Sequence, residues 1–157
     1  MWKVLVFLAP LCPICQDYTH FLNALEAQWE DRGVPVELVG LFPNPRVTEA
    51  DIARFAETYG VGWELALDTC GWAAALEADW TPECFLLDEA GNVMYSGRVN
   101  DLYFALGKHR AEPRVADLEE AVEAVLAGKR PPTSRTTPIG CPIENRIPEA
   151  PCATFSP

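Results

Sequence analysis

The sequence predicts an α/β fold with a central mixed β-sheet flanked by helices, followed by a proline-rich extended C-terminal tail. Apolar segments typical of buried strands alternate with helical patterns in the first half of the chain. Two strand-like segments then flank a short turn, which is the pattern of a β-hairpin. With 157 residues, of which 49% are hydrophobic, the chain is long enough to bury the core of one domain without disulfides.

The first elements alternate between strand and helix, as the elements of a parallel sheet do. Residues 2–9 are almost continuously apolar, which predicts a strand buried on both faces. Between residues 16 and 30, apolar side chains recur at helical spacing and form one face. A second strand is expected over residues 34–41, and a second helix begins at Thr48 and ends at Gly60.

The middle of the chain predicts shorter elements. A short strand is expected over residues 63–67 and a short helix over residues 71–78. Residues 84–88 and 93–98 flank the turn sequence Glu89-Ala90-Gly91-Asn92 and predict a hairpin. This hairpin would add an antiparallel edge to the sheet.

The last helix and the tail divide the chain. Asp117 is expected to cap a helix that ends at Gly128. Seven of the fourteen prolines lie beyond Lys129, so this stretch cannot build a helix or a central strand and should run extended over the surface. We therefore expect a domain of residues 1–128 and a tail of residues 129–157 that packs on it.

Charge and composition exclude several classes of function. The formal charge of −11 would repel phosphate backbones and anionic lipid, so neither nucleic acid nor a membrane surface is an expected partner. No apolar run is long enough to cross a bilayer. The first residues, MWKVLVFLA, lack the features of a secretory leader, so the chain as written is expected to be cytoplasmic; a preceding N-terminal segment would favour a periplasmic location.

Cys12 and Cys15 stand between the first strand and the first helix. A cysteine at a helix N-terminus faces unpaired N–H groups and the positive end of the helix dipole, and both favour the thiolate. Two intervening residues let the sulfurs form a disulfide with little backbone motion. The pair therefore predicts reversible dithiol–disulfide exchange, with a metal clamp or a permanent disulfide as alternatives.

The order of strand, CxxC, helix, βαβ unit, hairpin and helix resembles the thioredoxin-like arrangement. The sequence is similar to the redoxin (AhpC/TSA-type) or TlpA-like branch of the thiol–disulfide oxidoreductases, in the segments FLLDEAGNVMYSGRVND and GKHRAEPRVADLEEAVEAVLAGKRPPTSRTTPIGCPI as well as in Cys12-Pro13-Ile14-Cys15. The resemblance implies a thioredoxin-like fold in which Cys12 attacks and Cys15 resolves. Unlike many members of the family, the chain begins at the strand itself.

Three further catalytic-site residues follow from this resemblance. Thr81-Pro82 stands where the fold places a cis-proline beside the active site, and the backbone of Thr81 would then line the groove for a substrate peptide. Glu83 is a candidate acceptor for the proton of Cys15, with a solvated carboxylate as the alternative. A peroxidase is not expected, because Leu5 and Ala9 occupy the positions of its proline and its hydroxyl residue.

The remaining cysteines leave several roles open. Cys84 is expected to be a buried strand residue. Cys141 lies in the tail, and the resemblance suggests that its GCPI segment folds back on the domain. It could anchor the tail or form a structural disulfide, for instance with Cys152. It could also be a third redox thiol or a copper ligand beside Cys12.

Together these features predict a thiol–disulfide oxidoreductase that exchanges disulfides with protein substrates through its CPIC site. Its expected partners are protein thiols and disulfides and a redox-recycling partner, and no organic cofactor is expected. No oligomeric state is predicted. The alternative is a thioredoxin-like metallochaperone that binds copper or another soft metal through Cys12, Cys15 and Cys141.

Overall fold

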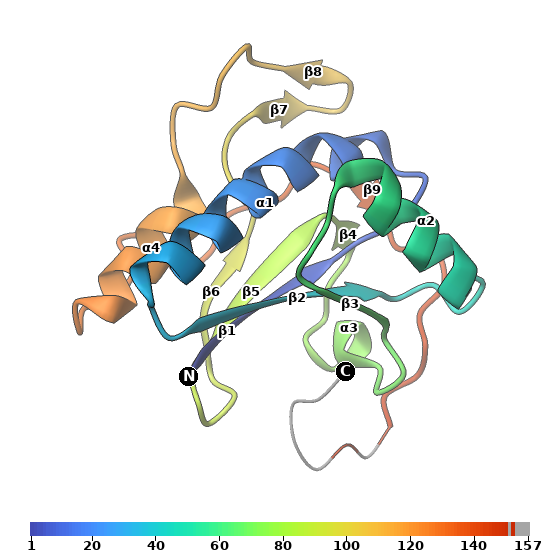
Figure 1. Ribbon diagram of the computed structural model, residues 1–157, viewed down its shortest axis with the longest axis horizontal. Coiled ribbons are helices and arrows are strands. Elements are labelled where there is room, and N and C mark those ends of the chain that lie inside the picture. The colour runs from blue at the N-terminus through green and yellow to red at the C-terminus, as the bar shows by residue number, and fades with distance from the viewer. Residues whose placement is uncertain (151, 153–157) are drawn as a thin grey trace.

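Five strands form the central sheet of the computed structural model, which describes residues 1–150 and 152 (Figure 1). They are β1 (Trp2–Phe7), β2 (Val36–Phe42), β3 (Glu64–Leu67), β5 (Glu83–Leu87) and β6 (Val93–Gly97). The strand order is β3-β2-β1-β5-β6, in which β1 runs parallel to β2, β2 runs parallel to β3, and β5 is antiparallel to both of its neighbours. The predicted mixed α/β sheet is confirmed.

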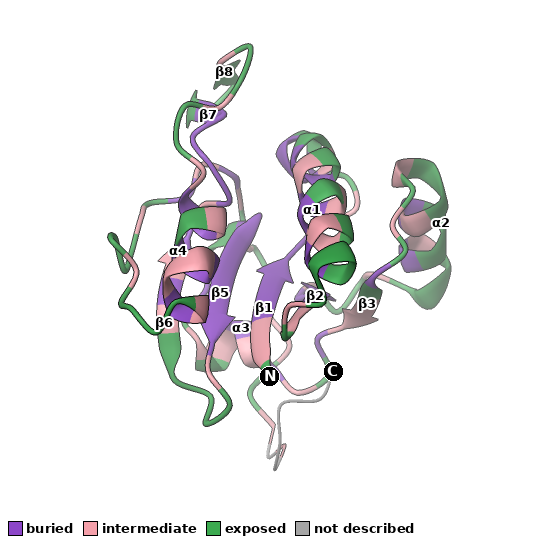
Figure 2. Ribbon diagram, turned by 60° about the vertical axis from the view of Figure 1, so that its left-hand side comes forward, coloured by how far each residue is buried: buried purple, intermediate pink, exposed green. Residues whose placement is uncertain are grey.

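Helices lie on both faces of this sheet. They are α1 (Pro13–Arg32), α2 (Glu49–Tyr59), α3 (Trp72–Ala75) and α4 (Asp117–Leu126). Helices α1, α2 and α4 cover one face, and α3 lies on the other (Figure 1). Val4 and Val6 of β1 belong to the first core, whereas Leu5 and Phe7 belong to the second. Strand β1 is therefore buried on both faces, as its apolar sequence predicts, and Figure 2 shows it together with the buried strand β5.

Helix α1 begins earlier than its apolar periodicity predicts. Its N-cap is Cys12, and Pro13 is the first helical residue. Proline is favourable there because it has no N–H to leave unpaired and its φ angle is already helical. The consequence is that Cys15 lies inside the first turn of the helix rather than ahead of it.

The predicted ends of α2 are confirmed. Thr48 is the N-cap, and its hydroxyl accepts a hydrogen bond from the backbone N–H of Asp51. The carboxylate of Asp51 in turn accepts from the N–H of Thr48, which completes a capping box. Gly60 ends the helix in the left-handed conformation, with φ of 65°.

The prediction that Asp117 caps α4 is wrong. The N-cap is Ala116, which makes no side-chain hydrogen bond, and Asp117 is the first residue of the helix. The buried carboxylate of Asp117 instead accepts from Arg98, whose Nε lies 2.8 Å from Oδ2. A charge-assisted bond to a guanidinium is stronger than a bond to a backbone N–H, which explains why the side chain turns away from the helix end.

Four strands of two or three residues each are too short to show the alternating apolar pattern of a strand in the sequence. Strands β7 and β8 form a small hairpin apart from the main sheet, and β4 and β9 form a second two-stranded sheet (Figure 1). Within the described part of the chain, no helix has the length and apolar character needed to cross a membrane. The bounds are β4 (Trp80–Thr81), β7 (Tyr103–Ala105), β8 (Lys108–His109) and β9 (Cys141–Pro142).

The tail follows the outside of the domain and is held at several points. The backbones of Arg135 and Ser96 form an isolated parallel β-bridge at the edge of β6, and β9 pairs with β4. Further on, the N–H of Ala150 donates to the carbonyl of Cys70 at 3.0 Å. The last part of the predicted tail, residues 151 and 153–157, lies outside the described residues.

The suggested pairing of Cys141 with Cys152 is wrong, because Cys152 forms a disulfide with Cys70. Cys141 is a free thiol, as are Cys12, Cys15 and Cys84. The disulfide thus fastens the end of the tail beside α3 and leaves Cys141 available for other chemistry.

Replacing Cys152 by alanine is expected to lower the free energy of unfolding by about 2–4 kcal/mol, because the bond closes a long loop in the unfolded chain. Its partners are 82 positions apart in the sequence. Urea denaturation of the variant at neutral pH measures the loss. Cys70→Ala and the double variant are the matched controls. Both should lose the same free energy of unfolding as Cys152→Ala. If the losses of the two single variants add up in the double variant, the two cysteines do not stabilise the fold through one shared disulfide.

Candidate active site

Cys12 lies at the turn between β1 and α1, as the sequence predicts. As the N-cap of the helix, its Sγ accepts a hydrogen bond from the backbone N–H of Cys15 over 3.4 Å. Sulfur here occupies the place that a serine or aspartate oxygen usually takes. Because the first turn presents unpaired N–H groups and the positive end of the helix dipole, this position stabilises a thiolate.

The two cysteines of the CPIC segment have opposite acidities. Hydrogen bonding from the side chain of Cys15 is the main cause that lowers the pKa of Cys12 from 9.0 to about 5, with smaller contributions from Cys141, the backbone of Cys15 and Thr81, against the effect of burial. Burial raises the pKa of Cys15 well above its ordinary value, and the adjacent Cys12 raises it further. At neutral pH the site therefore holds one thiolate, at Cys12, beside a protonated Cys15.

The Thr81–Pro82 peptide bond is cis, as expected from the resemblance. The carbonyl oxygen of Thr81 lies 3.4 Å from Cys12 Sγ. Thr81 is itself buried, and it belongs to the short strand β4 rather than to the main sheet. The bend at Pro82 thus places the backbone of Thr81 next to the nucleophilic sulfur.

The side chain of Glu83 stabilises the turn that precedes Pro82. Its Oε1 accepts hydrogen bonds from the backbone N–H groups of Asp79 and Trp80, at 2.9 and 3.2 Å. The residue is only 9% exposed, and burial raises the pKa of its carboxyl group. These contacts give Glu83 a structural role, and its role as proton acceptor for Cys15 stays a prediction.

Cys141 reaches the site from the far end of the chain. Strand β9 is antiparallel to β4, with Cys141 opposite Thr81, and the hydroxyl of Thr81 donates to the carbonyl of Cys141 over 3.3 Å. The Sγ atoms of Cys12 and Cys141 are 2.7 Å apart. Burial and then the neighbouring Cys12 raise the pKa of Cys141 to about 12, so its thiol donates to the Cys12 thiolate.

Cys84 stands apart from this chemistry. It is fully buried in β5, its Sγ lies 3.2 Å from the carbonyl oxygen of Gly97, and burial raises its pKa strongly. The expectation of a buried strand cysteine is confirmed.

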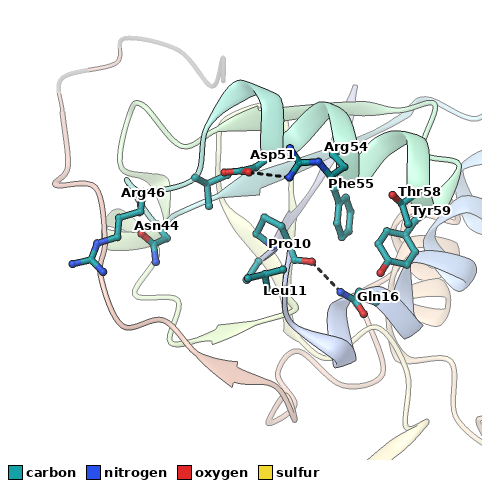
Figure 3. Close-up of a pocket in the computed structure, with 12 residues that line it drawn as sticks. Pro10, Leu11, Gln16, Asn44, Arg46, Asp51, Arg54, Phe55, Thr58 and Tyr59 are labelled. Carbon is teal, nitrogen blue, oxygen red and sulfur yellow. Dashed lines mark hydrogen bonds and ion pairs between the residues drawn. The ribbon is translucent and has the colours of Figure 1, made fainter.

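Two adjoining pockets lie beside the turn that precedes α1, and both are bordered by Leu11, which is 89% exposed. The smaller, of about 230 Å³, is lined by Cys12, Cys141 and Thr81. The larger, of about 510 Å³, lies between the Pro10-Leu11 turn and α2 (Figure 3). Cys12 itself is 3% exposed, so a substrate sulfur must approach through the smaller pocket.

Metal binding finds less support in the arrangement of side chains. Within residues 1–150 and 152, no three histidine, cysteine or acidic side chains are grouped as metal ligands. Cys15 lies in the interior, with none of its surface exposed. A closed ligand set of Cys12, Cys15 and Cys141 is therefore absent from this part of the chain.

The fold and the site together define a thioredoxin-like oxidoreductase, with a CxxC pair at the first helix and a cis-proline beside it. Residues 2–104 match the family described as Redoxin, and the chain belongs to this family. Among curated proteins, none matches the sequence.

Solved structures share the fold over most of the chain. A hypothetical protein from Sinorhizobium meliloti is 27% identical, with a TM-score of 0.78 and coverage of 94% of this chain and 81% of that one. An uncharacterized conserved protein from Geobacillus kaustophilus is 22% identical, with a TM-score of 0.75 and coverage of 97% and 79%. A secreted disulfide oxidoreductase from Mycobacterium tuberculosis is 19% identical, with a TM-score of 0.52 and coverage of 81% of each chain.

Proposed function

We propose that this oxidoreductase exchanges disulfides with protein substrates through Cys12 and Cys15. The observation that carries the proposal is the contrast between the two sulfurs, a thiolate at the helix N-cap and a protonated, fully buried thiol behind it. The thiolate is a nucleophile at neutral pH, and the protonated thiol reacts only after the mixed disulfide has formed. The exposed Leu11 and the adjoining pockets offer apolar surface on which a protein substrate can rest.

The reaction proceeds by two thiol–disulfide exchanges. The Cys12 thiolate attacks one sulfur of a substrate disulfide, and the other substrate sulfur leaves as a thiolate. Cys15 then loses its proton and attacks Cys12 Sγ, which releases the second substrate sulfur and forms the Cys12–Cys15 bond. Two electrons have passed to the substrate, and a recycling dithiol must return them.

The acidities of the two sulfurs are suited to this order. Two of the causes that raise the pKa of Cys15 are its hydrogen bond and its electrostatic interaction with Cys12. Both depend on a charged Cys12 sulfur, and that charge disappears when Cys12 enters a mixed disulfide. Cys15 is therefore easier to ionise at the step that needs it as a nucleophile.

A redox titration of the metal-free protein in a glutathione series tests the proposal, with differential alkylation and mass mapping of every cysteine. A reversible disulfide between Cys12 and Cys15 is expected within roughly −120 to −270 mV. Cys84 should stay reduced throughout and serves as the internal control. The proposal fails if Cys12 and Cys15 also stay reduced across the series.

The same titration bears on the compartment. Structural disulfides persist mainly in oxidising compartments, so the bond between Cys70 and Cys152 favours a periplasmic location over the cytoplasmic expectation. Reduction of this bond within the glutathione series would support that preference. If the bond persists below about −300 mV, it would also survive the glutathione pool of the cytoplasm. The bond would then no longer favour the periplasm over the cytoplasm.

A further inference from the structure

Strand β9 makes the contact with β4 that an extended peptide would make with a free strand edge. Trp80 pairs with Pro142 and Thr81 pairs with Cys141, and the N–H of Ile143 donates to the carbonyl of Asp79 at 2.9 Å. The backbone beside Cys12 is therefore occupied by a strand of the chain itself.

Gly140 lets this strand approach closely. A Cβ atom at this position would lie 2.3 Å from the carbonyl oxygen of Thr81, nearer than real Cβ atoms come to a backbone atom. The position has no left-handed φ angle, so the demand for glycine comes from the contact alone. Pairing with β4 thus holds Cys141, the next residue, at a defined place in the site.

That place lies within reach of a covalent bond. The Sγ atoms of Cys12 and Cys141 are 2.7 Å apart, and a disulfide requires about 2.05 Å. A closure of about 0.7 Å is within the range of ordinary side-chain motion. Both sulfurs also line the pocket of about 230 Å³ through which a substrate reaches Cys12.

We propose that Cys141 is a second resolving cysteine, which β9 holds against Cys12. When Cys12 carries a substrate in a mixed disulfide, Cys141 loses its proton to solvent and attacks Cys12 Sγ, and the substrate sulfur leaves as a thiolate. Cys15 then transfers its proton to the departing Cys141 as it attacks Cys12 Sγ, which leaves the Cys12–Cys15 bond. The inference rests on the proposed function, since the substrate disulfide supplies the oxidising equivalent.

Exposure favours Cys141 for the first of these attacks. Cys141 is partly exposed in the pocket, whereas Cys15 has no exposed surface. Burial is the largest cause that raises the pKa of Cys141, and the next two are its hydrogen bond and its electrostatic interaction with Cys12. These two interactions with the Cys12 thiolate are lost when Cys12 is bonded to substrate, for Cys141 as for Cys15. The more accessible sulfur therefore reacts first and passes the bond inward.

The test follows Cys15→Ser, Cys141→Ser and the double variant after reaction with insulin as the disulfide substrate, by non-reducing gel and mass mapping. In Cys15→Ser, Cys141 should displace the substrate, leaving a monomer with a Cys12–Cys141 bond. The double variant should retain the mixed disulfide at a yield at least about tenfold higher. The inference is overturned if Cys15→Ser holds as much mixed disulfide as the double variant and no Cys12–Cys141 peptide is found.

A second pair of variants keeps every cysteine in place. In the Cys15→Ser background, Gly140→Ala should loosen β9 and lower the yield of the Cys12–Cys141 bond about tenfold, because the two sulfurs are no longer held together. Gly62→Ala is the matched control, since a Cβ there meets no atom within 4 Å, and it should change nothing. Equal yields in the two variants would contradict the role of β9.

Failure of the inference can be told from failure of the proposed function. If the wild-type protein reduces insulin but Cys15→Ser never forms a Cys12–Cys141 bond, Cys141 is not a resolving cysteine and the CPIC exchange stands. If the wild-type protein does not reduce insulin or form a mixed disulfide in any variant, the proposed function itself is wrong.

Discussion

Replacing Cys12 by serine is expected to lower the rate of disulfide exchange by more than about a thousandfold, because the nucleophile of a covalent mechanism is lost. A serine hydroxyl is not ionised at neutral pH and cannot form a disulfide with the substrate sulfur. Neither Cys15 nor Cys141 can replace it, because Cys12 alone has a pKa near 5 and occupies the helix N-cap. Reduction of insulin with glutathione as the electron donor measures the loss.

The matched control is Cys84→Ser, the same substitution at a fully buried cysteine outside the site. The new hydroxyl can donate to the carbonyl oxygen of Gly97, which lies 3.2 Å from the present sulfur, so the fold should tolerate it. This variant should keep its activity within about a factor of two, as expected of a residue that contacts no reacting atom. A chelator in every assay separates exchange from any effect of bound metal. Activity that survives in Cys12→Ser would assign the nucleophile elsewhere.

Patterns within one segment predict a large part of this fold. The apolar run of β1, the helical spacing in α1 and the capping box of α2 each depend on residues close together in the sequence, and all three are present in the structure. The position of the CPIC pair between a strand and a helix follows from the same patterns. A lowered pKa at Cys12 is expected from that position, because the N-terminal turn of any helix favours a thiolate. In the structure the largest cause is hydrogen bonding from the side chain of Cys15.

The features that patterns within one segment do not predict depend on contacts between distant residues. Cys12 and Cys141 are separated by 129 positions, and the strands that bring them together contain two residues each, too few to show a period. The local sign of this contact is a cysteine in a proline-rich tail with no core to fill. The family resemblance adds that the GCPI segment folds back on the domain, and a place beside Cys12 is one of the roles left open for Cys141. Asp117 had the sequence of an N-cap, but a distant arginine, Arg98, took its carboxylate instead.

Alkylation of Cys12 by iodoacetamide is expected to rise with pH through a midpoint near 5, about four pH units below that of an ordinary thiol with a pKa of 9.0. The sign follows from the direction of the pKa shift. A lowered pKa means that the reactive thiolate is already formed above pH 5, so the rate should be flat from about pH 6 to 8. Short pulses between pH 3 and pH 9, followed by mass mapping, give the midpoint. Burial of Cys12 slows the reaction equally at every pH, so the midpoint is the quantity to compare.

The hydrogen bond from Cys141 is one cause of this low pKa, so Cys141→Ala should move the midpoint to higher pH. The shift should be only a part of the four units, because hydrogen bonding from Cys15 is the larger cause and remains in place. Cys84→Ala is the matched control and should leave the midpoint unchanged, since Cys84 is not among the causes of the shift. A wild-type midpoint near 9 would mean that the hydrogen bonds from Cys15 and Cys141 do not stabilise the thiolate. Cys12 would then lack the charge that sets it apart from Cys15 as the attacking sulfur.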